Sequence, residues 1–502
     1  MKSDELFALL KRRGFLWPTA EVYGGAQGLY DYGPLGASLK RRIEEVWSSW
    51  FVGLSEDFYL IDAAELLPEA VVRASGHLEN FTDAEVACGK CHSAFRAETL
   101  LEAARPQGVD GLSSSEIANL VRSTGVRCPT CGSQELTVPQ PFNLMFGVDF
   151  GVMGRERVYL RPETAQSSYL AFSRMWDVGR RALPLGIAVI GKAFRNEIAP
   201  RQVLFRMRSF TQAELQIFFD PESFAVPMHR VMDETLPVLS AERRAAGERD
   251  AESVRAADLA TAGVVPEFFV FHLAHTYRFL RDVLGYPADR IRLYEKSSQE
   301  RAFYNRIQYD VEVQQESLGG FRELGAVHYR GDYDLTRHSA GSGKDLSVVL
   351  GPDRRLLPHV LEITFGVDRL LWALADLGLT TKNERTVWSL RPYLAPVAVG
   401  VFPLLVREHA RVAQEVTQRL RAAGITARYD GSGSIGRRYA RGDEAGVPFA
   451  VTVDGETVDA SNPQHDTVTL RERDTRAQER VAIAALVERL RPSLAVPWPV
   501  PY

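Results

Sequence analysis

The sequence predicts a protein of mixed α and β structure in two parts, a large domain over residues 1–390 and a small α/β domain over residues 394–502. A proline-punctuated linker, Arg391-Pro392-Tyr393-Leu394-Ala395-Pro396, separates the two parts. Beyond it, apolar and amphipathic runs alternate as strand, helix, strand and strand, which predicts a mostly parallel sheet. Before it, two strand-like runs and a strand followed by a helix indicate a second sheet.

The composition is that of a globular protein, with 45% hydrophobic and 25% charged residues, and it excludes disordered and collagen-like classes. A net charge of -4 gives no general indication of a nucleic-acid partner, although a local basic surface can still exist. The charged N-terminus is unlike a signal peptide, and no run of eighteen apolar residues predicts a membrane span. We therefore expect a cytoplasmic protein.

A helix is predicted directly after Tyr32-Gly33-Pro34-Leu35-Gly36. Apolar residues recur there at three- and four-residue steps with charged residues between them. These residues are Leu39, Ile43, Val46, Trp47 and Trp50. Bulky aromatic residues on one helix face usually belong to a core, and a subunit interface is the alternative.

The four cysteines lie in an insert over residues 85–140, as two C-x2-C pairs that predict a metal site. The pairs are Cys88 with Cys91 and Cys128 with Cys131. Two such pairs can supply a closed tetrahedral set of thiolates for structural zinc, which leaves no open position for catalysis. Disulfide pairing, or a site that has lost its metal, are the alternatives.

Residues 187–197 and 209–219 are predicted to form two strands joined by an arginine-rich loop. Alternate strand residues share a face, so Arg195 and Glu197 point the same way. The second strand has a polar face that carries Phe210, Gln212, Glu214 and Gln216. A solvated sheet face commonly has this pattern, but the loop argues for a binding site.

That loop carries Arg201, Arg206 and Arg208 without a balancing acid, which is typical of a polyphosphate site. Residues 240–263, by contrast, are charged and alanine-rich and predict a peripheral helical insertion.

Residues 360–377 predict a strand followed by a helix, with Glu362 and Thr364 on one strand face. Gly366-Val367-Asp368-Arg369 begins the helix, where Arg369 can reach a terminal phosphate or stack on a base.

Two other glycine-rich segments have less specific patterns. Gly341-Ser342-Gly343-Lys344 lacks the preceding glycine and following hydroxyl of a phosphate-binding loop. Residues 431–436 match G-x-G-x-x-G and precede Arg437, Arg438 and Arg441. Nucleic-acid phosphate and a dinucleotide are both candidate ligands of that second segment.

Several of these segments resemble known motifs. Phe194-Arg195-Asn196-Glu197 resembles motif 2 of the class II aminoacyl-tRNA synthetases, Gly366-Val367-Asp368-Arg369 resembles motif 3, and the helix after Pro34 resembles motif 1. Further strings are similar to the dimeric glycyl-tRNA synthetases. They are Tyr32-Gly33-Pro34-Leu35-Gly36, Ser75-Gly76-His77, Arg161-Pro162-Glu163-Thr164-Ala165-Gln166, Phe210-Thr211-Gln212-Ala213-Glu214 and Arg437-Arg438-Tyr439-Ala440-Arg441.

The resemblance implies an α+β catalytic domain with an antiparallel sheet flanked by helices, insertions at about 85–140 and 220–265, and an anticodon-binding domain after the linker. It implies a homodimer that activates glycine with ATP and Mg²⁺ and transfers it to tRNA(Gly). Arg195, Glu197 and Arg369 would be catalytic.

The resemblance also implies two sets of binding residues. Those for ATP are Arg195, Asn196, Glu197, Phe205, Arg206, Met207, Arg208, Ser209, Phe210, Glu323, Leu324, Gly366, Val367, Asp368 and Arg369. Those for glycine are Arg96, Glu163, Phe210, Thr211, Gln212, Ala213, Glu214, Glu362, Ile363, Thr364, Phe365 and Gly366.

Three positions depart from the family pattern. Ser209 replaces a usual glutamate, Ser167-Ser168 replaces Gly-Ile, and Thr364 replaces a serine. A ligase for serine, threonine or proline, or a catalytically inactive RNA-binding relative, are the competing interpretations. The acidic pocket residues and the retained motif arginines favour an active glycine enzyme.

Overall fold

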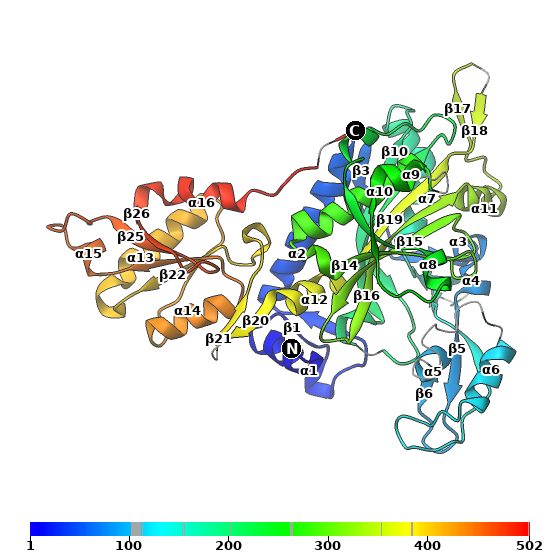
Figure 1. Cartoon of the computed structure of the whole chain (residues 1–502), viewed down its shortest axis with the longest axis horizontal. Helices are drawn as coiled ribbons and strands as arrows, with labels where there is room; N and C mark the ends of the chain where they lie inside the picture. The colour runs from blue at the N-terminus through cyan, green and yellow to red at the C-terminus, as the bar shows by residue number, and fades with distance from the viewer. Residues whose placement is uncertain are drawn as a thin grey trace.

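The computed structural model describes residues 1–101, 112, 114–152, 154, 156–200, 202–261, 265–352, 354–382, 385–499 and 501–502. A large domain is built on a wide twisted sheet, and a small domain, orange to red in Figure 1, lies beside it. No helix among the described residues is long and apolar enough to cross a bilayer.

The central sheet has nine strands, most of them antiparallel to their neighbours. In spatial order they are β13 (Glu252–Arg255), β12 (Thr235–Leu239), β14 (Ile291–Glu295), β15 (Ile307–Gln315), β16 (Gly320–Gly331), β19 (His359–Gly366), β11 (Ser209–Phe219), β10 (Leu185–Phe194) and β3 (Phe58–Ile61). Only the β12–β14 and β10–β3 pairs are parallel among these described strands. The predicted antiparallel sheet is confirmed.

One face of the sheet is covered by three helices, which form the main core. They are α2 (Pro34–Phe51), α10 (Glu267–Arg278) and α12 (Val367–Gly378). The apolar side chains predicted along α2, including Trp47 and Trp50, are buried within this single chain. The core interpretation of that helix face is therefore the correct one.

The other face is covered in part by α7 (Ala165–Val178) and α11 (Tyr333–Ser342). The period-2 pattern of β11 divides between the two faces: Leu215 and Ile217 enter the helix-covered core, whereas Glu214 and Gln216 face the other way. Glu214 is 3% exposed and Gln216 is fully buried, so this is not a solvated sheet face.

Two segments differ from their predictions. The strand predicted over 187–197 ends at Phe194, and the chain then turns so that the Arg195 amide donates to the Arg208 carbonyl at 3.0 Å. Arg201, in the same loop, lies outside the described residues. The helical insertion predicted over 240–263 is only partly helical. Between α8 (Ala241–Ala245) and α9 (Ala256–Thr261), edge pairing with β12 makes β13 a strand.

The cysteine-bearing insert has its own three-stranded sheet, in the order β6 (Ala94–Arg96), β5 (Thr82–Ala87) and β7 (Gln140–Asn143). Helices α5 (Ala97–Leu101) and α6 (Ser114–Ser123) complete it, and Cys88 and Cys128 belong to its small core. The remaining elements of the large domain are α1 (Ser3–Arg12), β1 (Leu16–Pro18), β2 (Tyr30–Tyr32), β4 (Leu66–Pro68), α3 (Glu69–Ala74), α4 (His77–Asn80), β8 (Phe146–Phe150), β9 (Glu156–Leu160), β17 (Val348–Leu350), β18 (Arg354–Leu356), β20 (Leu379–Lys382) and β21 (Arg385–Trp388).

The small domain is an α/β unit with a separate core. Its strands lie in the order β23 (Ala427–Tyr429), β22 (Val399–Pro403), β24 (Phe449–Val453), β25 (Thr467–Glu472) and β26 (Gln478–Ala482). Its helices are α13 (Val406–Ala422), α14 (Ile435–Glu444), α15 (Gly455–Val458) and α16 (Leu486–Leu494). The three strands expected from the sequence are parallel, and β25 and β26 are antiparallel, so the whole sheet is mixed.

After α16 the chain returns to the large domain, a path that Figure 1 shows in red. The Tyr502 amide donates to the Leu54 carbonyl at 2.9 Å, and its ring packs against Phe58 and Phe271. The Tyr502 hydroxyl bonds to His272 Nε2. The small domain is therefore attached to the large one at both of its ends.

Candidate active site

A cavity of about 370 Å³ opens on the sheet face that α7 and α11 leave uncovered. Arg195 and Arg369, from segments far apart in the sequence, both line it. The other predicted residues that line it are Arg96, Glu163, Glu197, Phe205, Arg206, Met207, Phe210, Gln212, Glu214, Glu323, Leu324, Glu362, Thr364, Gly366 and Asp368. The structure thus brings most of the predicted nucleotide and amino-acid residues into one space.

Eight predicted site residues do not line this cavity. The side chains of Thr211, Ala213, Ile363 and Phe365 occupy the opposite face of β11 and β19, because strand residues alternate. Val367 is in the main core. The other three lie where the loop between β10 and β11 begins and ends; they are Asn196, Arg208 and Ser209. Arg208 donates to the Glu197 carbonyl there at 3.0 Å. These three residues support the loop rather than face the cavity.

The guanidinium of Arg195 is held at one end of the cavity by the backbone and by aromatic rings. Its Nε donates to the Pro162 carbonyl at 3.2 Å. Its Cζ lies 5.2 Å from the Phe210 ring centroid and 5.3 Å from that of Phe81. This arrangement leaves the terminal nitrogens available for an anionic ligand.

Arg369 approaches the same space from the start of α12. Its Nη1 donates to the Glu323 carboxylate at 3.0 Å, and its Cζ lies 5.9 Å from the Phe205 ring centroid. Burial opposes ionisation of Glu323, but the charges of Arg369, Lys296 and Arg195 together outweigh it and lower the pKa of that carboxyl. Two guanidinium groups and aromatic faces at one end of a cavity suit a nucleotide.

Glu197 is buried at this end, and its Oε2 has no hydrogen-bond partner among the described residues. The nearest cation is Arg206, whose Nε is 3.7 Å from that oxygen. Burial and then the neighbouring charge of Arg96 lower the pKa of Arg206. A buried acceptor without a donor is costly, so Glu197 is available to a ligand donor.

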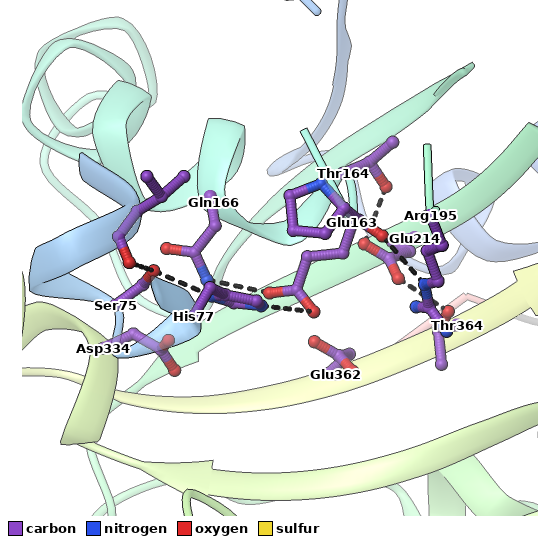
Figure 2. Close-up of polar contacts among 12 residues, drawn as sticks. Ser75, His77, Glu163, Thr164, Gln166, Arg195, Glu214, Asp334, Glu362 and Thr364 are labelled. Atoms are coloured by element: carbon purple, nitrogen blue, oxygen red, sulfur yellow. Dashed lines mark hydrogen bonds and ion pairs between the residues drawn. The ribbon is translucent and has the colours of Figure 1, made fainter. Parts of the chain in front are cut away.

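Three glutamates gather around the space shown in Figure 2, in which Arg195 is also labelled. Glu163 accepts from Gln166 at 2.8 Å and lies 3.6 Å from His77 Nε2. Glu214 accepts from Thr164 at 2.7 Å and from Thr364 at 2.8 Å. Glu362 accepts from Gln216 at 2.8 Å and contacts His328 Nδ1.

Arg330 is the principal cation of this acidic group. It is 2% exposed and does not line the main cavity. Its Nη1 donates to Glu362 at 2.9 Å, and its other nitrogens form a bidentate pair with Asp334 at 2.7 and 2.8 Å. Glu163 lies 3.9 Å from Nη2. Arg330 thus forms hydrogen-bonded ion pairs with two carboxylates and lies near a third, so its single charge is shared among them.

Among the described residues, Glu214 has no such cation. Burial, followed by the negative charges of Glu362 and Glu163, raises the pKa of Glu214 to about 7. The opposite holds for Glu163 and Glu362: burial opposes their ionisation, but His77 and Arg330, respectively, are the leading groups that lower their pKa values. The site therefore has a deficit of positive charge at Glu214, which a cationic ligand would fill.

Several lining residues have no counterpart among the predictions. Tyr304 comes from the segment that joins β14 to β15, Gln308 and Asp310 come from β15, and His328 comes from β16. Nothing in the spacing of these residues distinguishes them from ordinary strand and loop residues. Ser75 and His77 belong to a string that resembles the glycyl-tRNA synthetases, and they contact each other at 2.8 Å between Oγ and Nδ1.

The four cysteines converge as predicted, and all are free thiols. Their sulfurs lie within 4.8 Å of one another, with Cys88–Cys131 at 3.6 Å and Cys91–Cys128 at 3.5 Å. Four sulfurs at about 2.3 Å from one tetrahedral ion would lie about 3.8 Å apart. The cluster therefore fits a metal, and the disulfide alternative is not what the structure has.

The two cysteine turns have matching backbones. The amide of Cys88 donates to the Ser93 carbonyl at 2.9 Å, and the amide of Cys128 donates to the Ser133 carbonyl at 2.8 Å. The fifth residue of each turn has positive φ, at 57° for His92 and 73° for Gly132. Such turns direct both sulfurs and nearby amides to one point.

The insert meets the active site through Arg96, which lines the main cavity at the end of β6. Its Nε is 2.8 Å from Asp83, and its Nη2 is 2.9 Å from Glu98. The cysteine cluster and the site thus share one small sheet.

Comparisons with protein families assign the architecture. Residues 150–377 match the family described as tRNA synthetase class II core domain (G, H, P, S and T), and residues 394–492 match the Anticodon binding domain. The prolyl-tRNA synthetase of Cryptosporidium parvum, solved with L-proline and AMP, has a similar fold at a TM-score of 0.57 and 13% identity. That comparison covers 98% of this chain and 75% of the other. The fold and the core-domain match are those of the class II aminoacyl-tRNA synthetases.

Full-length relatives narrow this class. The glycine–tRNA ligase of Thermococcus gammatolerans is 36% identical, with 98% of each chain covered. That of Methanothermobacter thermautotrophicus is 36% identical over 97% of this chain and 98% of its own. That of Aeropyrum pernix is 38% identical over 97% and 96%. The chain belongs to the glycine–tRNA ligase family.

The Arg330 network predicts a large stability effect. Arg330→Leu would leave Glu362 and Asp334 buried without their cation, and we expect it to destabilise the large domain by about 3–5 kcal/mol. Arg255→Ala removes an exposed pair with Asp258 and should leave the stability almost unchanged. Urea unfolding followed by tryptophan fluorescence measures both variants. Equal midpoints for the two variants would contradict this role of Arg330.

Proposed function

We propose that this protein is a glycine–tRNA ligase that activates glycine with ATP and then transfers it to the 3′ end of tRNA(Gly). The observation that carries the proposal is the cavity that Arg195 and Arg369 share with the Glu163, Glu214 and Glu362 cluster. A nucleotide fits the two arginines and the aromatic rings, and a small ammonium compound fits the glutamates. The full-length similarity to glycine–tRNA ligases supports the same activity.

In the first step, a carboxylate oxygen of glycine attacks the α-phosphorus of ATP. The bond to the bridging oxygen of the β-phosphate breaks, which gives glycyl-adenylate and pyrophosphate. Arg195 would hold the α-phosphate and stabilise the charge that develops there. Phe210 would stack on the adenine from one side and Arg369 from the other, while Glu197 would accept a hydrogen bond from the base. No side-chain nucleophile is required, so the protein acts by position and charge.

Magnesium, when bound, neutralises phosphate charge during this transfer. Glu323, together with Asp310, supplies carboxylates in the cavity that would hold it. Both are hard oxygen donors, which fit this ion.

Glu163, Glu214 and Glu362 would bind the ammonium of glycine. The Thr364 hydroxyl fixes Glu214 at 2.8 Å, and its methyl group narrows the pocket. Arg96 would contact the carboxylate or the adenylate. In the second step, a terminal ribose hydroxyl of tRNA attacks the glycyl carbonyl carbon and AMP leaves.

The remaining assignments follow from the same family. Residues 1–390 would form the catalytic domain, with insertions at about 85–140 and 220–265, and residues 394–502 would bind the anticodon. We further propose a cytoplasmic homodimer. Because the apolar face of α2 is already buried in its own chain, dimer contacts would use other surfaces of that region, such as the exposed Leu60 on edge strand β3.

Glycine-dependent exchange of pyrophosphate into ATP tests the proposal directly. We expect exchange with glycine and not with serine, threonine or proline. Arg195→Ala should reduce it by about a hundred- to a thousandfold, because a half-buried, charge-stabilising donor is lost. Arg255→Ala, which removes an exposed arginine, serves as the matched control. Exchange driven by serine would reassign the substrate, and none with any amino acid would favour an RNA-binding protein.

The raised pKa of Glu214 predicts a pH dependence. Below pH 7 this carboxyl is protonated and no longer attracts an ammonium, so kcat/KM for glycine should fall toward tenfold per pH unit. Above pH 7 the anion is present and kcat/KM should level off. Glu214→Gln should have a low kcat/KM that no longer changes across this window. An unchanged acid limb in that variant would assign the titration to another group.

We also propose structural zinc at Cys88, Cys91, Cys128 and Cys131. Elemental analysis of purified protein should find one zinc per chain. Cys128→Ser should lose it, whereas Thr130→Ala, at an exposed position in the same turn, should keep it. Because the cluster shares a sheet with Arg96, the metal-free variant should also have a raised KM. Folded wild-type protein without metal would contradict the proposal.

A further inference from the structure

We propose that Tyr304 is a specificity-determining residue, whose ring is the wall that keeps the amino-acid pocket too small for a side chain. This inference rests on the proposed glycine activity. Its evidence is a second cavity that adjoins the first.

The second cavity has a volume of about 340 Å³ and lies beside α11. Phe303, Tyr304, Arg306, Tyr333 and Arg337 are among the residues that line it. Tyr304 also lines the main cavity, and among the described residues it is the one side chain that the two linings share. The ring of Tyr304 is therefore the boundary between the two spaces.

Contacts with Arg330 fix where this boundary lies. The Arg330 Cζ is 4.0 Å from the Tyr304 ring centroid, so the ring covers the guanidinium. The same guanidinium is 2.9 Å from Glu362 and 3.9 Å from Glu163. Burial and then the charge of Glu163 raise the pKa of the Tyr304 phenol, which agrees with this proximity. The ring thus stands next to the carboxylates that would hold the ammonium.

The position of the ammonium limits the position of a side chain. The N–Cα bond is about 1.46 Å long, so the Cβ of an L-amino acid lies only about 2.5 Å from the nitrogen. A wall close to the glutamates therefore decides whether a Cβ is admitted. Hydrogen fits against the Tyr304 ring, whereas a methyl or hydroxymethyl group meets it.

The ring is also well supported, which a discriminating wall requires. Its centroid lies 4.9 Å from that of Phe303 and 6.2 Å from that of Tyr333, so it is part of an aromatic cluster. Packing of this kind resists displacement by a ligand atom. Without the ring, the two cavities would join, and a side chain bound beside the glutamates could extend toward Arg306 and Tyr333.

The test compares glycine with alanine and serine in pyrophosphate exchange by the full-length protein. Tyr304→Ala should reduce the ratio of kcat/KM for glycine to that for alanine by about ten- to 200-fold, the range that one methylene can supply. The effect should come mainly from a gain in alanine-dependent exchange. Tyr304→Phe should keep the wild-type ratio, because the ring remains. Thr336→Ala, at an exposed position that lines only the second cavity, should keep it as well.

The outcomes separate this inference from the proposed function. If wild-type protein exchanges no pyrophosphate with glycine, the function fails. If it does, and Tyr304→Ala retains the wild-type ratio or loses exchange with every amino acid while folded, the wall is refuted. If Tyr304→Phe also lowered the ratio of kcat/KM for glycine to that for alanine, the effect would belong to the hydroxyl and the proposal would be refuted as well. Tyr304→Leu, which removes the ring and keeps an apolar side chain, gives the same test if the alanine variant does not fold.

Discussion

Three carboxylates in one buried pocket are the constraint on which the active end of this protein depends. Antiparallel pairing of β11 with β19 sets Glu214 opposite Thr364 and Gln216 opposite Glu362, so the register itself brings like charges together. Arg330 and His77 stabilise the anions of Glu362 and Glu163. Glu214 receives hydrogen bonds from the hydroxyls of Thr164 and Thr364. The pocket therefore has an excess of negative charge that one more positive charge would neutralise. The polar residues around it keep the three carboxylates in this arrangement.

Much of the fold could be predicted from the sequence, because its strands are half-buried and keep period 2. The alternation along β11 and the strand–helix transition at Gly366 are both present as expected. Pairing with β12 overrides the helical composition around Glu252, and the turn after Phe194 follows from a bond to Arg208 rather than from local propensity. The sequence of a single segment does not predict structure that depends on tertiary contacts of this kind.

The site was predictable to the extent that chemistry and motif spacing agreed. Resemblance alone placed whole strings such as Phe210–Glu214 in the site, yet alternation sends Thr211 and Ala213 to the opposite core. Tyr304 and His328, by contrast, reach the site only because the β14–β15 connection and β16 come beside it in space. Neither residue belongs to a periodic or motif-like pattern, so only the assembled sheet reveals them.

At two of the three departures from the family pattern, the substituted side chain forms a hydrogen bond with its neighbours. Ser168 donates to the Ile187 carbonyl at 3.3 Å, and Thr364 keeps the hydroxyl that holds Glu214. Ser209 begins β11 opposite Phe194, away from the lining of the cavity.

The return of the chain to Leu54 and His272 makes residues 391–502 a closed loop in topological terms. The linker fixes one end, and the Tyr502 contacts fix the other. The Tyr502 contacts act like a non-covalent cross-link. While they hold, the unfolded small domain has fewer conformations, so its unfolding is less favourable. Release of one aromatic ring from a pocket in the neighbouring domain therefore governs how independently the small domain can unfold.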